Sequence, residues 1–155
     1  MSSSSSSELR PLEDRRYERF VELFAEFMPP DSEAVYRELG LSPEEAAALP
    51  RSVGELRQVE EDGAVAGYAW LELRDRTLHV HALLLEPEFR GRGLGGVVLA
   101  ELEREFEDRV DEVELGVLPG NARALALYEK AGFERVGERL GFLIMRKPVV
   151  RATRG

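Results

Sequence analysis

A glycine-rich turn is the first part of the chain suited to chemistry. Residues 91–96 read Gly-Arg-Gly-Leu-Gly-Gly and join a predicted strand to a predicted helix. Inside a helix each glycine would cost close to ~1 kcal/mol relative to alanine. At a strand-to-helix turn, glycines instead let free N–H groups and the positive end of the helix dipole approach an anion. With Arg90 and Arg92 at the same turn, the segment predicts a pyrophosphate site.

Two other nucleotide-binding motifs fit this turn less well. A P-loop needs Lys and then Ser or Thr after its last glycine, whereas Val97 follows Gly96. The dinucleotide pattern G-x-G-x-x-G matches Gly91, Gly93 and Gly96, but it belongs to an early β-α-β unit, and three antiparallel-looking strands precede this turn. A domain that prefers NAD stays a distant alternative, as does a flexible loop without a ligand.

The hydrophobic pattern predicts the elements that hold this turn. They are a strand (8–12), helices (17–28 and 32–39, the second capped by Asp31 or Ser32), a helical turn or loop (41–50), strands (55–59, 65–74 and 77–85), a helix after the turn, a strand (112–118), a helix (121–131) and two strands (within 133–147). The order β-α-α-βββ-α-β-α-ββ predicts an α/β fold, a mixed sheet with helices on both faces.

Length and composition limit the class of protein. The 155 residues predict one domain over 8–150, after a serine-rich tail at 1–7 that we expect to be disordered. The absence of cysteine excludes disulfides and thiolate chemistry, and two histidines cannot form a structural zinc site, so no metal is expected. No basic leader and no run of ~18 apolar residues is present, which predicts a soluble, cytoplasmic protein. The net charge of −9 disfavours nucleic acid and anionic membranes as partners.

Two motifs together resemble the GCN5-related N-acetyltransferase (GNAT) superfamily. Residues 87–95 read Pro-Glu-Phe-Arg-Gly-Arg-Gly-Leu-Gly, similar to that family's (Arg/Gln)-x-x-Gly-x-(Gly/Ala) turn. Residues 121–133 read Asn-Ala-Arg-Ala-Leu-Ala-Leu-Tyr-Glu-Lys-Ala-Gly-Phe, similar to its Asn-x-x-Ala block that ends in Gly-Phe. The first motif is moderately specific, and the pair in this order is strong. The resemblance extends over 8–148, with the N-terminal third similar in layout only.

The resemblance implies the GNAT fold and a transferase that uses acetyl-CoA. In such a protein the backbone of Leu83 and Leu85 pairs with the pantetheine arm, the amides of 91–96 hold the pyrophosphate, and Asn121 contacts the arm. The implied cofactor-binding residues are Leu83, Leu84, Leu85, Arg90, Gly91, Arg92, Gly93, Leu94, Gly95, Gly96, Asn121 and Tyr128. Asn121 is also suited to cap the following helix, and both roles are compatible.

Tyr128 is the candidate general acid. The resemblance implies that it lies near the thioester sulfur, and a tyrosine of pKa ~10 can donate a proton to a departing thiolate of pKa ~8.5. The alternative is that Tyr128 is simply a core aromatic residue of an amphipathic helix.

His79 and His81 are the candidate bases. An amine of pKa ~10.4 is only about 0.04% neutral at pH 7, a deficit of roughly 4.6 kcal/mol, which a base of pKa near 6.5 would relieve. The two histidines share one face of the strand before the turn, and His-x-His here resembles the arylalkylamine branch of the superfamily. They are also candidates for ordinary packing or surface residues. Glu72, Glu86 and Glu114 are the alternative bases.

The expected reaction is transfer of the acetyl group to a primary amine of a small molecule, peptide or protein, by direct attack in a ternary complex. The alternative is a non-catalytic acyl-CoA-binding regulatory module of the same fold. The acidic net charge favours a cationic acceptor. A homodimer through the C-terminal strands is a further option, with 142–145 as an apolar edge.

Overall fold

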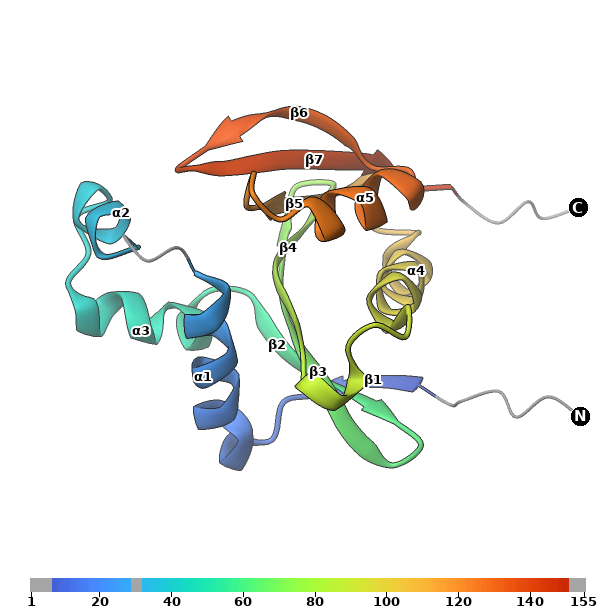
Figure 1. Cartoon of the computed structure of the whole chain (residues 1–155), viewed down its shortest axis with the longest axis horizontal. Helices are drawn as coiled ribbons and strands as arrows, with labels where there is room; N and C mark the ends of the chain where they lie inside the picture. Colours follow the sequence, from blue (N-terminus) through green and yellow to red (C-terminus); the bar gives the residue numbers. More distant parts are fainter. Residues whose placement is uncertain (1–6, 29–31, 151–155) are drawn as a thin grey trace, which may run out of the picture. The chain divides into compact units, whose positions relative to one another are not determined.

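The computed structural model describes residues 7–28 and 32–150 (Figure 1). Their helices and strands follow one another in the order below. They are β1 (Ser7–Pro11), η1 (Asp14–Arg16), α1 (Tyr17–Phe27), α2 (Ser32–Glu38), α3 (Pro43–Ser52), β2 (Glu55–Glu61), β3 (Ala64–Arg74), β4 (Thr77–Leu85), η2 (Pro87–Phe89), α4 (Leu94–Phe106), β5 (Glu112–Val117), α5 (Ala122–Lys130), β6 (Glu134–Arg139) and β7 (Phe142–Pro148).

The chain divides into two compact units. The first comprises Met1–Leu71 and Ala82–Arg92, and the second comprises Glu72–His81 and Gly93–Gly155. β3 and β4 each contribute residues to both units, so neither unit is a continuous piece of chain. The single domain predicted over 8–150 stays a prediction.

The first unit is built around the aromatic face of α1. Its buried core contains Phe20 and Leu23 of α1, Tyr68 and Trp70 of β3, and Ala82 and Leu84 of β4. The rings of Phe20 and Tyr68 meet edge to face at 6.3 Å, a favourable aromatic geometry. β3 and β4 approach so closely that a Cβ at Gly67 would lie 2.2 Å from the carbonyl oxygen of Leu84. This packing fixes the last residues of β4, which lead into the glycine-rich turn.

The second unit contains α4, α5 and the strands β5, β6 and β7. α4 buries Val98, Leu102 and Phe106, which recur at four-residue steps as expected for the inner face of a helix. β4 pairs in parallel with β5 from Thr77 opposite Glu112 to Val80 opposite Leu115. β5 then pairs antiparallel with β7, and β7 with β6, and Figure 1 shows the last two as a hairpin.

The hydrogen-bonded strand order is β1-β2-β3-β4-β5-β7-β6. The predicted mixed α/β sheet is therefore confirmed. The expected apolar edge at 142–145 is wrong, because these residues lie on β7, which pairs with β5 on one side and β6 on the other. The strand at that end of the order is β6, whose residues are all exposed. A homodimer stays a prediction without that edge.

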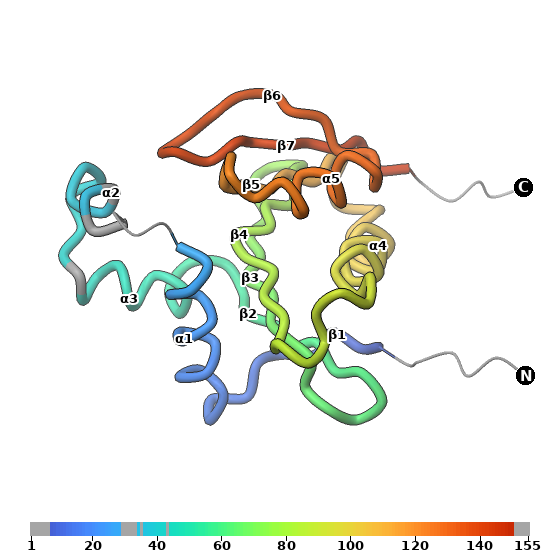
Figure 2. The backbone as a smooth tube through the Cα atoms, in the orientation of Figure 1, coloured from blue at the N-terminus to red at the C-terminus, as the bar shows by residue number. Residues whose placement is uncertain are grey.

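Three further details differ from the expected boundaries. The segment left open as a helical turn or loop is α3, because Ser42 and Glu45 form a reciprocal capping box before it. Ser7, assigned to the tail, is the first residue of β1, while residues 1–6 and the proposed cap Asp31 lie outside the described residues. α4 starts at Leu94, so two of the glycines belong to its first turn (Figure 2).

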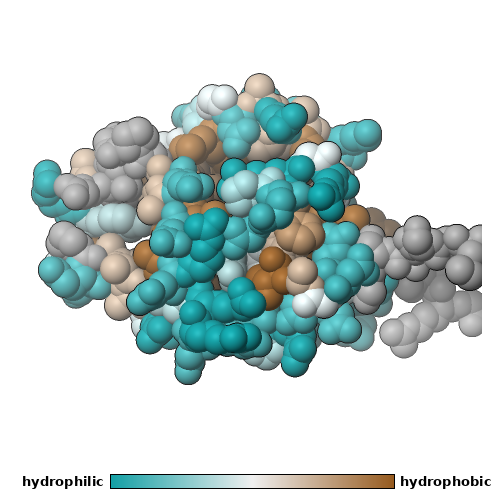
Figure 3. Space-filling model, turned by 60° about the horizontal axis from the view of Figure 1, so that its bottom comes forward, coloured by the Kyte–Doolittle hydropathy of each residue, from teal (hydrophilic) through white to brown (hydrophobic). Residues whose placement is uncertain are grey.

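Hydrophilic side chains cover most of the surface in the view of Figure 3, and hydrophobic ones form small separate areas. The large hydrophobic side chains that are exposed come from separate segments, namely Leu39, Leu73, Val97, Val136, Leu140 and Val150. Scattered single residues of this kind are usual on a protein surface. Among the described helices, none combines the length and apolar character needed to span a membrane.

Candidate active site

The turn before α4 has the backbone of an anion site. Gly91 and Gly93 have φ values of 78° and 76°, a region that glycine enters without steric cost. Gly93 is the N-cap of α4 and makes no side-chain cap, and the first turn carries no acidic residue. The first N–H groups of a helix have no acceptor inside the helix. The positive end of α4 is therefore open to an anionic group.

A test of fit for a phosphate comes from the space around the glycines. A Cβ at Gly91 or Gly93 would meet nothing within 4 Å, and at Gly96 it would meet only Leu127 Cδ1, at 3.9 Å. Gly96 also lies in a helix at an ordinary φ. Protein packing therefore does not explain this glycine, whereas close approach of a ligand to the backbone does. The residues of the turn fit a pyrophosphate.

The two arginines of the turn have protein contacts of their own. Arg90 Nε donates a hydrogen bond to the carbonyl oxygen of Leu85, at 3.0 Å, and its guanidinium lies 3.6 Å from Glu26. The Arg92 guanidinium lies over the ring of Phe89, 5.4 Å from its centroid. Arg90 thus ties the turn to the end of β4, the strand expected to run beside the pantetheine arm.

On β4 the predicted residues alternate between two faces. Leu84 is buried in the core, whereas Leu83 and Leu85 point to the other face and are partly exposed. His79 and His81 share this second face, as the two-residue period of a strand requires.

Asn121 and Tyr128 lie at the two ends of α5. Asn121 Oδ1 accepts a hydrogen bond from the backbone N–H of Ala124 at 3.1 Å, so the predicted helix cap is confirmed. Tyr128 is partly buried, and its ring meets Phe133 edge to face at 5.9 Å. Burial raises the pKa of Tyr128 above its ordinary value of 10.0. The phenol therefore keeps its proton at neutral pH, as a proton donor must.

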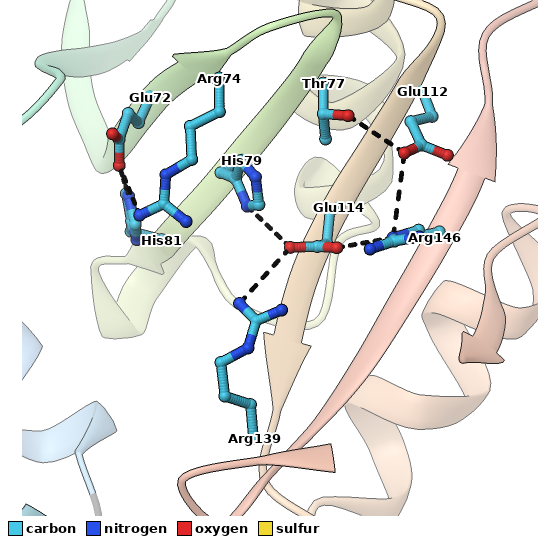
Figure 4. Close-up of polar contacts among 9 residues, drawn as sticks. All are labelled: Glu72, Arg74, Thr77, His79, His81, Glu112, Glu114, Arg139 and Arg146. Carbon is cyan, nitrogen blue, oxygen red and sulfur yellow. Dashed lines mark hydrogen bonds and ion pairs between the residues drawn. The ribbon is translucent and has the colours of Figure 1, made fainter. Parts of the chain in front are cut away.

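A polar cluster surrounds the two histidines on one face of the second unit (Figure 4). His81 Nε2 is hydrogen-bonded to Glu72 at 2.7 Å, and His79 Nδ1 lies 2.8 Å from Oε1 of Glu114. The imidazole rings stack with their centroids 6.2 Å apart. Each histidine therefore has its own carboxylate, one from β3 and one from β5.

Burial sets the acid–base character of the cluster. It lowers the pKa of His79 and of His81 below 6.5, against the attraction of the neighbouring carboxylates. Arg74 contributes to the lowering in both cases. Hydrogen bonds from Arg74 and His81 lower the pKa of Glu72. Both rings are therefore neutral at pH 7 and can accept a proton.

The three alternative bases have different surroundings. Glu86 accepts a forked hydrogen bond from Arg19, at 2.6 Å to Nη2 and 3.1 Å to Nε for one oxygen. Glu72 binds His81 and Arg74. Glu114 is only 2% exposed and lies beneath His79. Each carboxylate is thus already paired with a cation or an imidazole.

The sequence analysis did not identify the arginines of this cluster. Arg146 of β7 donates through Nε to Glu114 Oε2 at 2.6 Å, and Arg139 of β6 lies 3.9 Å from the same carboxylate. Both are separated from Glu114 by an entire helix and hairpin in the chain. Their only signal was alternation along strands, which does not reveal register between strands.

A cavity of about 500 Å³ in the second unit does not coincide with these residues. It is lined by α4 residues such as Leu99 and Glu103, together with Phe133 and Lys147. Of the predicted site residues, Gly96 alone lines it. The titratable groups converge on the β4–β5–β7 face instead, so we place the acid–base chemistry there. Within residues 7–28 and 32–150, no group of three His, Cys, Asp or Glu side chains could hold a metal ion.

Solved structures share this fold. The ribosomal-protein-S18-alanine N-acetyltransferase from Escherichia coli superposes with a TM-score of 0.68 at 22% identity, covering 96% of this chain and 97% of that one. PaiA N-acetyltransferase from Thermoplasma acidophilum, in complex with coenzyme A, gives 0.67 at 20% identity, with coverage of 92% and 99%. At this identity the likeness confirms the predicted GNAT fold.

Sequence relatives define the family. The model of the acetyltransferase (GNAT) family matches residues 17–133. A mycothiol acetyltransferase of Clavibacter michiganensis is 40% identical over 75 residues, 48% of this chain and 24% of that protein. N-alpha-acetyltransferase RimI of Mycobacterium tuberculosis is 41% identical over 81 residues, half of each chain. The match thus spans a quarter to a half of these relatives. The chain belongs to the acetyltransferase (GNAT) family, as its two motifs predicted.

Proposed function

We propose that this protein is an N-acetyltransferase that moves the acetyl group of acetyl-CoA to a primary amine. The observation that carries the proposal is the glycine turn before α4, with open N–H groups and unfilled space, in a chain of the acetyltransferase family. The family's relatives include enzymes named for acetyl transfer. We expect the N–H groups of Gly93–Gly96, with Arg90 and Arg92, to hold the pyrophosphate.

The chain's own residues would then serve the two proton transfers. Acetyl-CoA supplies the acetyl group as a thioester, which a neutral amine attacks. Tyr128, protonated because burial raises its pKa, would donate a proton to the sulfur. A neutral histidine, His79 or His81, would take a proton from the incoming ammonium group. Leu83, Leu85 and Asn121 would orient the pantetheine arm.

The acceptor is proposed as a primary amine of a peptide or a small molecule. Among the relatives, RimI is named an N-alpha-acetyltransferase and a structural neighbour a ribosomal-protein-S18-alanine N-acetyltransferase. A peptide that begins with alanine is therefore the first acceptor to test, followed by a lysine peptide, a polyamine and an arylalkylamine. The excess of acids favours the cationic acceptors.

The test is release of free CoA thiol from acetyl-CoA with each amine, followed by mass spectrometry of the product. The proposal predicts release that depends on an amine, with a mass increase of one acetyl group. Binding of acetyl-CoA without release for any amine would instead favour the non-catalytic acyl-CoA-binding module. Absence of both would refute the proposal.

A further inference from the structure

A row of three polar side chains crosses adjacent strands of the second unit. His79 of β4 is the register partner of Glu114 on β5, and Glu114 is the partner of Arg146 on β7. His79 Nδ1 lies 2.8 Å from Oε1 of Glu114, while Arg146 Nε donates to Oε2 at 2.6 Å. Figure 4 shows the carboxylate between the imidazole and the guanidinium. Glu114 thus presents one oxygen to each neighbour.

Glu114 is ionised in this setting. Its side chain is 3% exposed, and a buried carboxylate without a cation would be strongly unfavourable. Arg146 supplies that cation, with Arg139 at 3.9 Å. An ionised carboxylate can only accept protons. Two atoms that both carry lone pairs repel at 2.8 Å, so the proton of neutral His79 belongs on Nδ1.

The second histidine has the opposite arrangement. Nε2 of His81 faces Glu72 at 2.7 Å, so the carboxylate draws the proton of this ring to Nε2. For His79, by contrast, Nε2 makes no hydrogen bond with any described residue. Its lone pair is therefore available to a substrate. Free histidine favours the Nε2–H tautomer, so the His79 form must be imposed by its surroundings.

We propose that Glu114 is a positioning residue that holds His79 as the Nδ1–H tautomer and so makes Nε2 of His79 the base of the reaction. This inference rests on the proposed acetyl transfer and chooses between its two histidines. In the step, one N–H bond of the ammonium group breaks and its electron pair stays on nitrogen. The proton forms a new bond to Nε2, and the resulting imidazolium is stabilised by Glu114. It later returns the proton to solvent.

The charges around His79 agree with this role. Glu114 and Glu72 raise its pKa, while Arg74 and His81 lower it together with burial. Arg139, Arg146 and Glu112 complete the charged groups that face this part of the strand row. Glu114 is the carboxylate with the largest effect on His79. Its removal should therefore weaken the base.

The tautomer can be measured directly, because the chain contains only two histidines. Two-dimensional ¹⁵N–¹H spectra of the imidazoles at pH 8 should show His79 as Nδ1–H and His81 as Nε2–H, with assignment by H79Q and H81Q. In E114Q, the His79 signals should move toward the usual Nε2–H form. Wild-type His79 in the Nε2–H form would overturn the proposal without any variant.

The pH profile tests whether this tautomer matters in catalysis. H79A should lower kcat about 10²–10⁴-fold and abolish the acidic limb of the profile, which H81Q should retain. E114Q should move that limb to lower pH by at least about one unit, because an opposite charge at this distance is lost. E112Q is the matched control, since Glu112 also lies by Arg146 but binds Thr77 rather than a histidine.

The outcomes separate the inference from the proposed function. A lower rate in E114Q with an unmoved limb would reduce Glu114 to a structural residue and contradict the proposal, as would a limb that E112Q moves equally. Wild-type protein that acetylates no amine would refute the proposed function. In that case the tautomer of His79 still decides whether Glu114 positions the ring.

Discussion

At the scale of single residues, the surroundings of each titratable side chain decide its chemistry. Tyr128 and His79 are both partly buried, yet burial affects them in opposite senses. It raises the pKa of the tyrosine and lowers that of the histidine, because in each case the neutral form is favoured. Near pH 7 the protein therefore holds one proton donor and one proton acceptor, as acetyl transfer to an amine requires.

Substitution of Tyr128 by Phe tests the donor. The variant keeps the ring that packs on Phe133 but loses the hydroxyl, so we expect kcat to fall by about 10²-fold or more while the Kd for CoA stays nearly the same. Turnover and isothermal titration measure the two quantities. Unchanged turnover would remove Tyr128 from the acid role.

The histidines also make stability depend on pH. Their pKa values are below 6.5 in the folded protein, so between those values and 6.5 the unfolded chain binds more protons. Stability therefore falls as the pH is lowered through this window. Glu72, with a lowered pKa, acts in the same direction but only below pH 4.5.

Urea unfolding at pH 7.5 and at pH 5.0 measures this effect. Wild type should lose more stability between the two values than the double variant H79Q/H81Q, which has no imidazole to protonate. Equal losses in both proteins would show that the histidines are not buried in the neutral form.

Glu114 illustrates what the sequence could and could not predict at this scale. Its residue type and strand position made it a candidate base, and His79 and Asn121 were found in the same way. Its role depends on Arg146, which lies 32 positions away and meets it only through the β5–β7 register. Spacing along one chain contains no such register, so the positioning contact could not be predicted.

At the scale of elements, the turn from β4 into α4 is the feature that we connect with the cofactor. The glycine spacing predicted it, because positive φ values and open helix N–H groups are local properties. The start of α4 at Leu94 was placed too late, since glycine is counted against a helix although its first turn tolerates it. The burial of β7 between two strands was missed because strand order is a long-range property.

Substitution of Gly93 by Ala tests the turn. At φ 76° and with free space around a Cβ, the expected cost is backbone strain of roughly 1–2 kcal/mol. We also expect the affinity for CoA to fall about tenfold or more, because a misplaced N–H loses a hydrogen bond to a charged phosphate.

Gly63 provides the matched control for this variant. It lies at φ 85° in the β2–β3 turn, again with nothing within 4 Å of a Cβ, so G63A should lose similar stability without loss of CoA affinity. Urea unfolding and titration calorimetry compare the two. Equal affinities in G93A and G63A would contradict a pyrophosphate site at α4.

At the scale of the whole molecule, membership of the acetyltransferase family and the turn before α4 lead to the same ligand. The family match covers 17–133 and so includes both the turn and α5. The acceptor is less defined, because α1, α2 and β6 showed resemblance in layout only or are exposed. Binding of the donor is therefore the central claim.

The most direct measurement is the melting temperature with acetyl-CoA, with CoA and with NAD. A ligand at 100 times its Kd stabilises the folded protein by about 2.7 kcal/mol, which raises the melting temperature clearly. We predict an increase with acetyl-CoA and with CoA but not with NAD. No increase with either CoA compound, or an increase with NAD alone, would contradict the account.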